Sequence, residues 1–162
     1  MRWDDFAQAC PQIADVAAAR FAADQVVMLG TIRADGSPRV SGCEPDIAAG
    51  RLCLGMMWRS RKALDLLRDP RIVVHSVPSD RMNAGGDIKL SGHAIEETDL
   101  DVRAVYRDVI RARIDWAPDE PAFHLFSVDV REAAHIRFGD DRLVWHWDAQ
   151  RGFRELRHPD AG

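Results

Sequence analysis

The segment RLCLGMMWRSRKALDLLRDPR, residues 51–71, holds a strand, a cluster of positive charge and a short helix in direct succession. The apolar run from Arg51 to Met57 is typical of a buried strand. Ser60 is a favourable helix N-cap, apolar residues recur after it at helical spacing, and Asp69-Pro70 ends the helix. A short helix is therefore predicted between Ser60 and Asp69.

The first turn of this helix carries Arg61 and Lys62, two cations at the end where the helix dipole disfavours positive charge. The free amides of a first helical turn favour an anion, so two added cations are best explained by a bound phosphate. Residues 59–71 carry a net charge of +3, in a chain whose net charge is −4. The alternative is that these side chains are merely solvated, as many surface arginines are.

Length and composition indicate one ordinary globular domain spanning residues 1–162, which either completes its own core or completes it by dimerising. A pI near 5.8 argues against nucleic-acid binding. No apolar run is long enough for a membrane span, and the acidic N-terminus does not look like a signal peptide, so we expect a cytoplasmic protein. The cysteines lack a CxxC pair, and we expect no metal site.

Hydrophobic patterning predicts an N-terminal helix at about residues 11–23 and then a β-rich region. Strands are predicted over residues 26–33, 39–47, 51–57, 72–77 and 87–96. The links between the first three strands are too short for parallel crossovers, so antiparallel pairing is expected and a doubly wound nucleotide fold is disfavoured.

The second half of the chain begins with a helix that Thr98 or Asp99 can cap, and then continues in two more strands. These strands are predicted over residues 123–138, with a bend near Glu132, and 143–148. About seven strands with few helices suggest a small closed barrel at about residues 25–148, because closure removes exposed sheet edges.

The order and spacing of several short motifs resemble the flavin-binding split barrels related to pyridoxamine 5′-phosphate oxidase, over about residues 20–150. The motifs are Asp35-Gly36-Ser37-Pro38-Arg39-Val40, Ser60-Arg61-Lys62, Asp69-Pro70-Arg71 and Leu90-Ser91-Gly92-His93-Ala94. The resemblance implies a mainly β protein with flanking helices, built as an antiparallel split β-barrel of the FMN-binding type.

The resemblance also implies a cofactor site. Ser60, Arg61 and Lys62 match the segment that holds the phosphate of flavin mononucleotide (FMN), in agreement with the charge argument. Arg39, Val40 and Ser41 match a strand that lies along the isoalloxazine ring and ribityl chain. Gly55 and Met56 match a strand end at which the backbone approaches the cofactor.

Asp87 stands where the oxidase has a ring-contacting glutamine, and a carboxylate cannot donate the hydrogen bond that an amide donates. The family is generally homodimeric, with two cofactor sites at the subunit interface. The resemblance therefore implies a homodimer here as well.

The function implied is that of a flavin-dependent oxidoreductase, which transfers a hydride between bound FMN and a small organic substrate. The C-terminus lacks the tail with which the true oxidases grip their substrate, so the vitamin oxidase activity itself is not expected. Two alternatives stay open: a reductase that uses the deazaflavin coenzyme F-420, and a non-enzymatic module that binds flavin or haem.

No catalytic acid or base is predicted, because hydride chemistry belongs to the cofactor. His93 is the best placed histidine, and a structural role is the simpler interpretation of it. Cys43 is interpreted as a packing thiol, since neighbouring Glu44 would raise its pKa rather than lower it. Trp145 and Trp147 either cover a flavin face or pack on the last strand.

Overall fold

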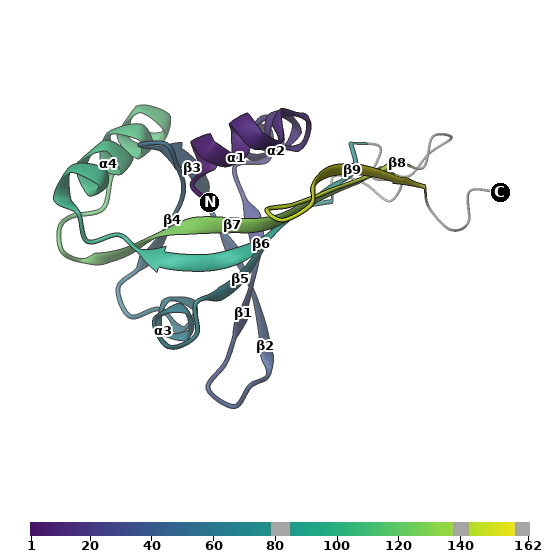
Figure 1. Ribbon diagram of the computed structural model, residues 1–162. Helices are drawn as coiled ribbons and strands as arrows, with labels where there is room; N and C mark the ends of the chain where they lie inside the picture. Colours follow the sequence, from purple (N-terminus) through teal and green to yellow (C-terminus); the bar gives the residue numbers. More distant parts are fainter. Residues whose placement is uncertain (79–84, 138–142, 158–162) are drawn as a thin grey trace.

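The computed structural model describes residues 1–78, 85–137 and 143–157 (Figure 1). Helices and strands follow the chain in this order: α1 (Trp3–Ala9), α2 (Pro11–Asp24), β1 (Val27–Ile32), β2 (Pro38–Cys43), β3 (Pro45–Ala48), β4 (Arg51–Met57), α3 (Arg61–Arg68), β5 (Arg71–Ser76), β6 (Asp87–Glu96), α4 (Leu100–Ile114), β7 (Phe123–Arg137), β8 (Leu143–Asp148) and β9 (Gly152–Arg157). Phe138, the predicted end of one strand, lies outside the described residues. No helix in the described parts of the chain is long and apolar enough to span a membrane.

The strands form one curled antiparallel sheet in the order β2-β1-β5-β6-β7-β4-β3. The strand predicted over residues 39–47 is broken at Glu44: β2 pairs with β1, whereas β3 pairs with β4. Pro45 begins β3 and has no N–H to donate, so the ladder cannot continue unbroken through this position. The two ends of the sheet are therefore joined by the chain itself.

The expectation of a closed barrel is wrong, because no ladder of hydrogen bonds joins the end strands β2 and β3 among the described residues. The antiparallel, mainly β fold with flanking helices is confirmed, and its open sheet has the form of a split barrel. The number of strands alone did not reveal this gap. The end strands β2 and β3 are consecutive in the chain, so the backbone connects them although no hydrogen bonds pair them.

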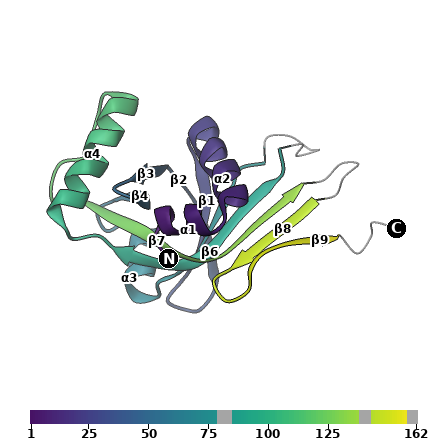
Figure 2. The same ribbon diagram turned by 45° about the horizontal axis from the view of Figure 1, so that its top comes forward.

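The long strand β7 is the point at which the sheet divides. One edge of β7 pairs with β6 along most of its length, while the other edge pairs first with β4 and then with β8. A register shift leaves Arg131 as an extra residue opposite Ser91 and Gly92, next to the bend predicted near Glu132. Beyond this bulge, β8 and β9 leave the barrel as a ribbon (Figure 2).

Helices α1 and α2 cover one side of the barrel. Phe6 of α1 packs edge-on against Trp147 of the ribbon, with ring centroids 5.0 Å apart, and both side chains are buried. Trp147 is therefore a packing residue. Trp145 packs against Phe153, and its indole N–H donates to the Glu155 carboxylate. Neither α1 nor β9 was predicted from the sequence.

Helix α4 lies on another side, over a second small core that contains Tyr106, Ile110 and Phe123. Asp99 caps this helix as predicted: its side chain accepts hydrogen bonds from the Asp101 and Val102 amides. Helix α3 packs beside β1 and β4, and α4 packs against β3. In Figure 1, α4 lies above β4 and α3 lies below it.

Candidate cofactor-binding site

A cavity of about 660 Å³ lies between β2, β4, α3, α4 and the loop of residues 115–122. Its size is that of a small-molecule site. Met56, Tyr106, Ile110 and Phe123 make much of the wall apolar. Lys62, Glu44 and Asp119 supply the charged groups of the lining.

The start of α3 adjoins this cavity. Lys62 lines it, and its Nζ donates to the Gly42 carbonyl at 2.5 Å. An ammonium group has three hydrogens, so it can make further hydrogen bonds. Arg61 is exposed, and among the described residues it makes no hydrogen bond or ion pair.

Ser60 occupies the N-cap position of α3, but its side chain makes no capping hydrogen bond. Its Oγ is buried and finds no hydrogen-bond partner among the described residues. Buried hydroxyls are normally paired. The predicted capping contact is therefore absent. The Ser60 hydroxyl can hydrogen-bond to a further group at the start of this helix.

Arg39 turns toward α3 and not toward the cavity. Its Nε donates to the buried Asp65 carboxylate at 2.6 Å, and Thr31 donates to the same oxygen at 3.1 Å. Val40 is 68% exposed, and Ser41 is half-buried. The cavity is lined by the next three residues along the strand, Gly42, Cys43 and Glu44. The resemblance offered no signal for these three positions, and the predicted cofactor contacts of Val40 and Ser41 stay predictions.

Gly55 and Met56, which the resemblance matched to a strand end beside the cofactor, line the cavity. The space beside Gly55 is filled by a side chain of α4, however. A Cβ at this position would lie 1.9 Å from the Tyr106 hydroxyl oxygen. The glycine therefore allows the tyrosine to approach the strand, whatever else approaches it.

Asp87 lies apart from this cavity. It is on β6, and β5 and β1 separate that strand from β2 in the sheet. Its carboxylate is 4.0 Å from His75 Nε2. Within one chain, Asp87 therefore does not meet Lys62, and a shared site would need a second copy.

The wall formed by α4 and the loop of residues 115–122 was not predicted as part of the site. Arg103 holds the loop with two hydrogen bonds to the Glu120 carboxylate, at 2.8 and 2.7 Å. Arg107 donates to the Pro118 carbonyl at 2.8 Å. Tyr106 was not predicted as a site residue, because its proximity to Gly55 joins positions that are far apart in the sequence.

Two titratable side chains in the wall are kept neutral. Burial raises the pKa of the Cys43 thiol and of the Tyr106 phenol. The thiol donates to the Gly55 carbonyl, with 3.4 Å between sulfur and oxygen. Cys43 is thus the packing thiol that was expected. His93 pairs with Arg71 in the sheet and does not line the cavity.

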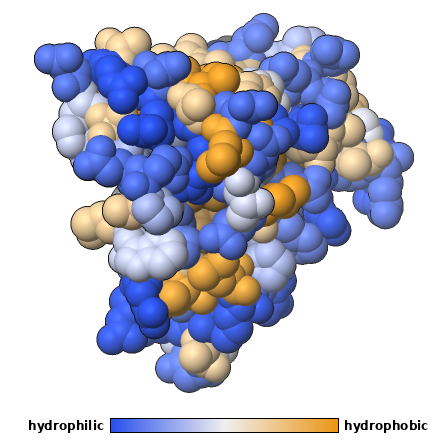
Figure 3. Space-filling view, turned by 90° about the vertical axis from the view of Figure 1, so that its left-hand side faces the viewer, coloured by the Kyte–Doolittle hydropathy of each residue, from blue (hydrophilic) through white to orange (hydrophobic). Residues whose placement is uncertain are grey.

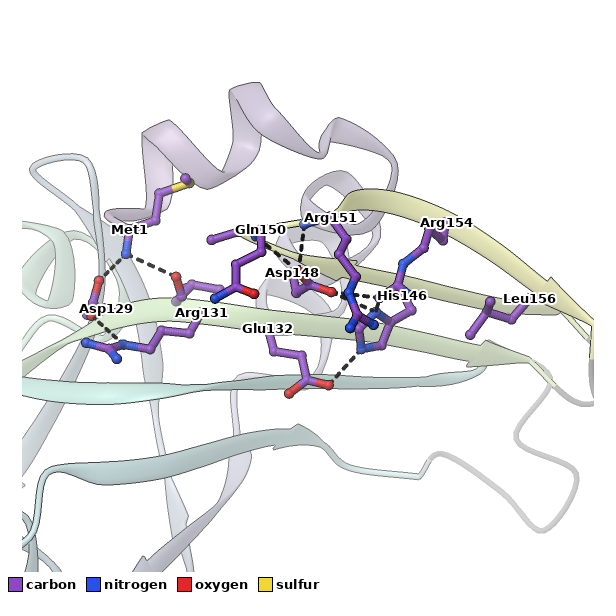
Figure 4. A pocket seen from close by; sticks show the side chains of 12 residues that line it. Met1, Asp129, Arg131, Glu132, His146, Asp148, Gln150, Arg151, Arg154 and Leu156 are labelled. Carbon is purple, nitrogen blue, oxygen red and sulfur yellow. Dashed lines mark hydrogen bonds and ion pairs between the residues drawn. The ribbon is translucent and has the colours of Figure 1, made fainter.

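A larger cavity of about 940 Å³ lies between the N-terminus and the β8–β9 ribbon (Figure 4). Its charged groups mostly bind one another. His146 Nε2 is 2.7 Å from Glu132 and its Nδ1 is 2.8 Å from Arg154, which also pairs with Asp148 at 2.7 Å. This polar face thus stabilises the ribbon, and the cavity beside α3 is the better candidate for a ligand.

No family model and no curated protein sequence matches the chain. Solved structures do resemble it. A NimC/NimA family protein from Clostridium acetobutylicum has a TM-score of 0.68 at 15% identity, over 86% of this chain and 95% of that protein. Another protein of this organism, related to general stress protein 26 of B. subtilis and of the pyridoxinephosphate oxidase family, has a TM-score of 0.62 at 15% identity, over 82% and 92% of the two chains.

A haem-binding protein from Mycobacterium smegmatis is also similar, with a TM-score of 0.61 at 19% identity over 87% of this chain. The chain spans 57% of that protein's length. At such identities the similarity concerns the fold. The chain thus has the split-barrel fold of the pyridoxamine 5′-phosphate oxidase-like proteins, and the predicted resemblance is confirmed at that level.

Proposed function

We propose that the protein binds FMN and acts as an oxidoreductase, transferring a hydride between the cofactor and a small organic substrate. The start of α3 is the observation that carries the proposal. There, the buried Ser60 Oγ lacks a partner among the described residues, and Arg61 and Lys62 follow it in the first turn of the helix. Lys62 also lines the largely apolar cavity.

The residues present fit a phosphorylated, flat cofactor. Free amides, a hydroxyl and two cations suit a phosphate dianion. Met56, Tyr106 and Phe123 offer the apolar surface that a ring system needs. FMN, when bound, would supply the hydride chemistry, while this chain binds it, orients it and excludes water.

Titration with FMN, followed by absorbance and fluorescence, tests the proposal. We expect a low-micromolar or smaller dissociation constant, which corresponds to a binding free energy of about −8 kcal/mol or more negative. The same titration with the deazaflavin coenzyme tests the alternative cofactor, which also carries a phosphate. If neither cofactor binds, the proposal is wrong.

Replacing Arg61 and Lys62 together by alanine tests the phosphate contact. Each charge-assisted contact contributes roughly 1.5 to 3 kcal/mol, so FMN binding should weaken by at least about a hundredfold. Riboflavin lacks the phosphate and should bind the variant almost as well as the original protein. Arg71→Ala is the matched control, because Arg71 is an exposed arginine that pairs with Asp69. Equal losses for FMN and riboflavin would place the phosphate elsewhere.

A second candidate is a non-enzymatic module that holds flavin or haem. The similarity to a haem-binding protein favours it. Bound FMN that a nicotinamide donor reduces and quinone acceptors reoxidise would favour the enzyme. Cofactor that binds but never turns over would favour the module, and haem titration completes the comparison.

A further inference from the structure

Tyr106, the chain's sole tyrosine, is buried in the wall of the cavity. It is 3% exposed, and its hydroxyl group reaches the backbone of β4 at Gly55. The position a Cβ would take at Gly55 is 1.9 Å from the hydroxyl oxygen and 2.8 Å from Cζ. The glycine therefore admits the polar end of the tyrosine into the cavity wall.

The hydroxyl group has no hydrogen-bond partner in residues 1–78, 85–137 and 143–157. The neighbouring Cys43 thiol donates to the Gly55 carbonyl instead. The side chain as a whole is buried, but its oxygen is not sealed from the cavity that Tyr106 lines. The O–H group is therefore a donor that a ligand in the cavity can reach.

The geometry makes this group a fixed donor. The Tyr106 ring stacks on Phe123 at a centroid distance of 6.0 Å, and Gly55 closes in on the hydroxyl end. Burial raises the pKa of the phenol, and the nearby Asp46 carboxylate raises it further, so the proton stays on the oxygen at neutral pH.

We propose that the Tyr106 O–H donates a hydrogen bond to a ring carbonyl oxygen or ring nitrogen of the flat cofactor bound in the cavity. This inference rests on the proposed function and adds the contact that orients the ring. It assigns ring recognition to α4, whereas the start of α3 recognises the phosphate.

A single NMR signal can test the contact, because there is one tyrosine. In protein labelled with ¹³C at tyrosine Cζ, both FMN and riboflavin should move the Tyr106 resonance by the same amount. A flavin that binds, as its visible spectrum shows, while the resonance stays in place would overturn the proposal. If no flavin binds, the proposed function fails first. The deazaflavin coenzyme and haem are then titrated against the same resonance, and a signal that none of them moves also overturns the assignment.

Affinity gives the second measurement. Tyr106→Phe removes the donor and keeps the ring, so FMN and riboflavin should each bind about three- to tenfold more weakly. The Arg61→Ala, Lys62→Ala variant instead weakens FMN alone, which separates the ring contact from the phosphate contact. Unchanged affinity of Tyr106→Phe for both flavins would refute the hydrogen bond.

Discussion

At the scale of single residues, the Tyr106 hydroxyl group occupies the space beside Gly55 that a side chain at position 55 would need. Strand β4 therefore depends on a glycine for its contact with α4. The two positions are coupled, although they are far apart in the sequence.

We expect Gly55→Ala to lower the free energy of unfolding by about 1–3 kcal/mol, because the new methyl group overlaps the Tyr106 oxygen. Combining it with Tyr106→Phe should cost less than the sum of the two single changes, by about 1 kcal/mol. Urea unfolding of the single and double variants measures this coupling.

Gly30→Ala is the matched control, since a Cβ there would make an ordinary 3.6 Å contact with Val73. Its effect should stay within about 0.5 kcal/mol. Additive losses at 55 and 106 would show that the hydroxyl moves aside at no cost.

At the scale of elements, α3 is tied to the β1–β2 hairpin through Asp65. Burial alone would raise the pKa of this carboxyl group, but the hydrogen bonds from Arg39 and Thr31 outweigh it and hold the pKa below its usual value. The ion pair thus fixes the helix whose first turn carries Arg61 and Lys62. The predicted contact of Arg39 with the cofactor ring stays a prediction.

Replacing Arg39 by methionine should lower the free energy of unfolding by about 2 kcal/mol at pH 7, the range of a hydrogen bond to a charged group. Asp65 has a lowered pKa in the folded state, so its contribution is complete above the unfolded pKa of about 3.9 and is lost as the pH falls through the folded value. The loss caused by Arg39→Met should therefore shrink at low pH.

Urea unfolding at pH 7 and at about pH 2.5 makes the comparison. Arg71→Met removes an exposed pair with Asp69 and should change stability by less than about 1 kcal/mol at pH 7. An Arg39→Met loss that did not depend on pH would point to lost packing of the arginine stem.

Sequence patterns predicted those elements that carry their own local signals. The bounds of β4, β6 and β8 and the Asp99 cap of α4 agree with the structure, because alternation, turns and caps are local. Helix α1 has only seven residues and no side-chain cap, so it depends on the burial of Trp3 and Phe6. The α4 wall of the cavity was missed for a similar reason: it arises from packing between distant segments.

At the scale of the whole molecule, the exposed apolar side chains suggest a second copy. Val40 on β2 and Met57 at the end of β4 are 68% and 78% exposed, on the two strands that flank the cavity. Figure 3 shows hydrophobic residues reaching the surface among hydrophilic ones, on the side where α3 and α4 lie. Exposed apolar surface beside a site often marks an interface.

We expect a homodimer at micromolar concentration, measured by sedimentation equilibrium. Val40→Glu together with Met57→Glu should give monomers, because two buried charges per subunit would face an apolar partner surface. Unfolding stability of the separated subunit should change little, since both side chains are exposed in the single chain.

Leu100→Glu is the matched control for this interface, because Leu100 is 73% exposed at the start of α4 and should leave the dimer intact. Whether Asp87 can take part in the cofactor site also depends on the dimer, because within one chain Asp87 lies away from Lys62. If the partner brings its Asp87 to the cavity, the double glutamate variant should lose flavin affinity along with the dimer. A monomeric original protein that still binds FMN tightly would instead show that α3, α4 and β4 of one chain make the complete site.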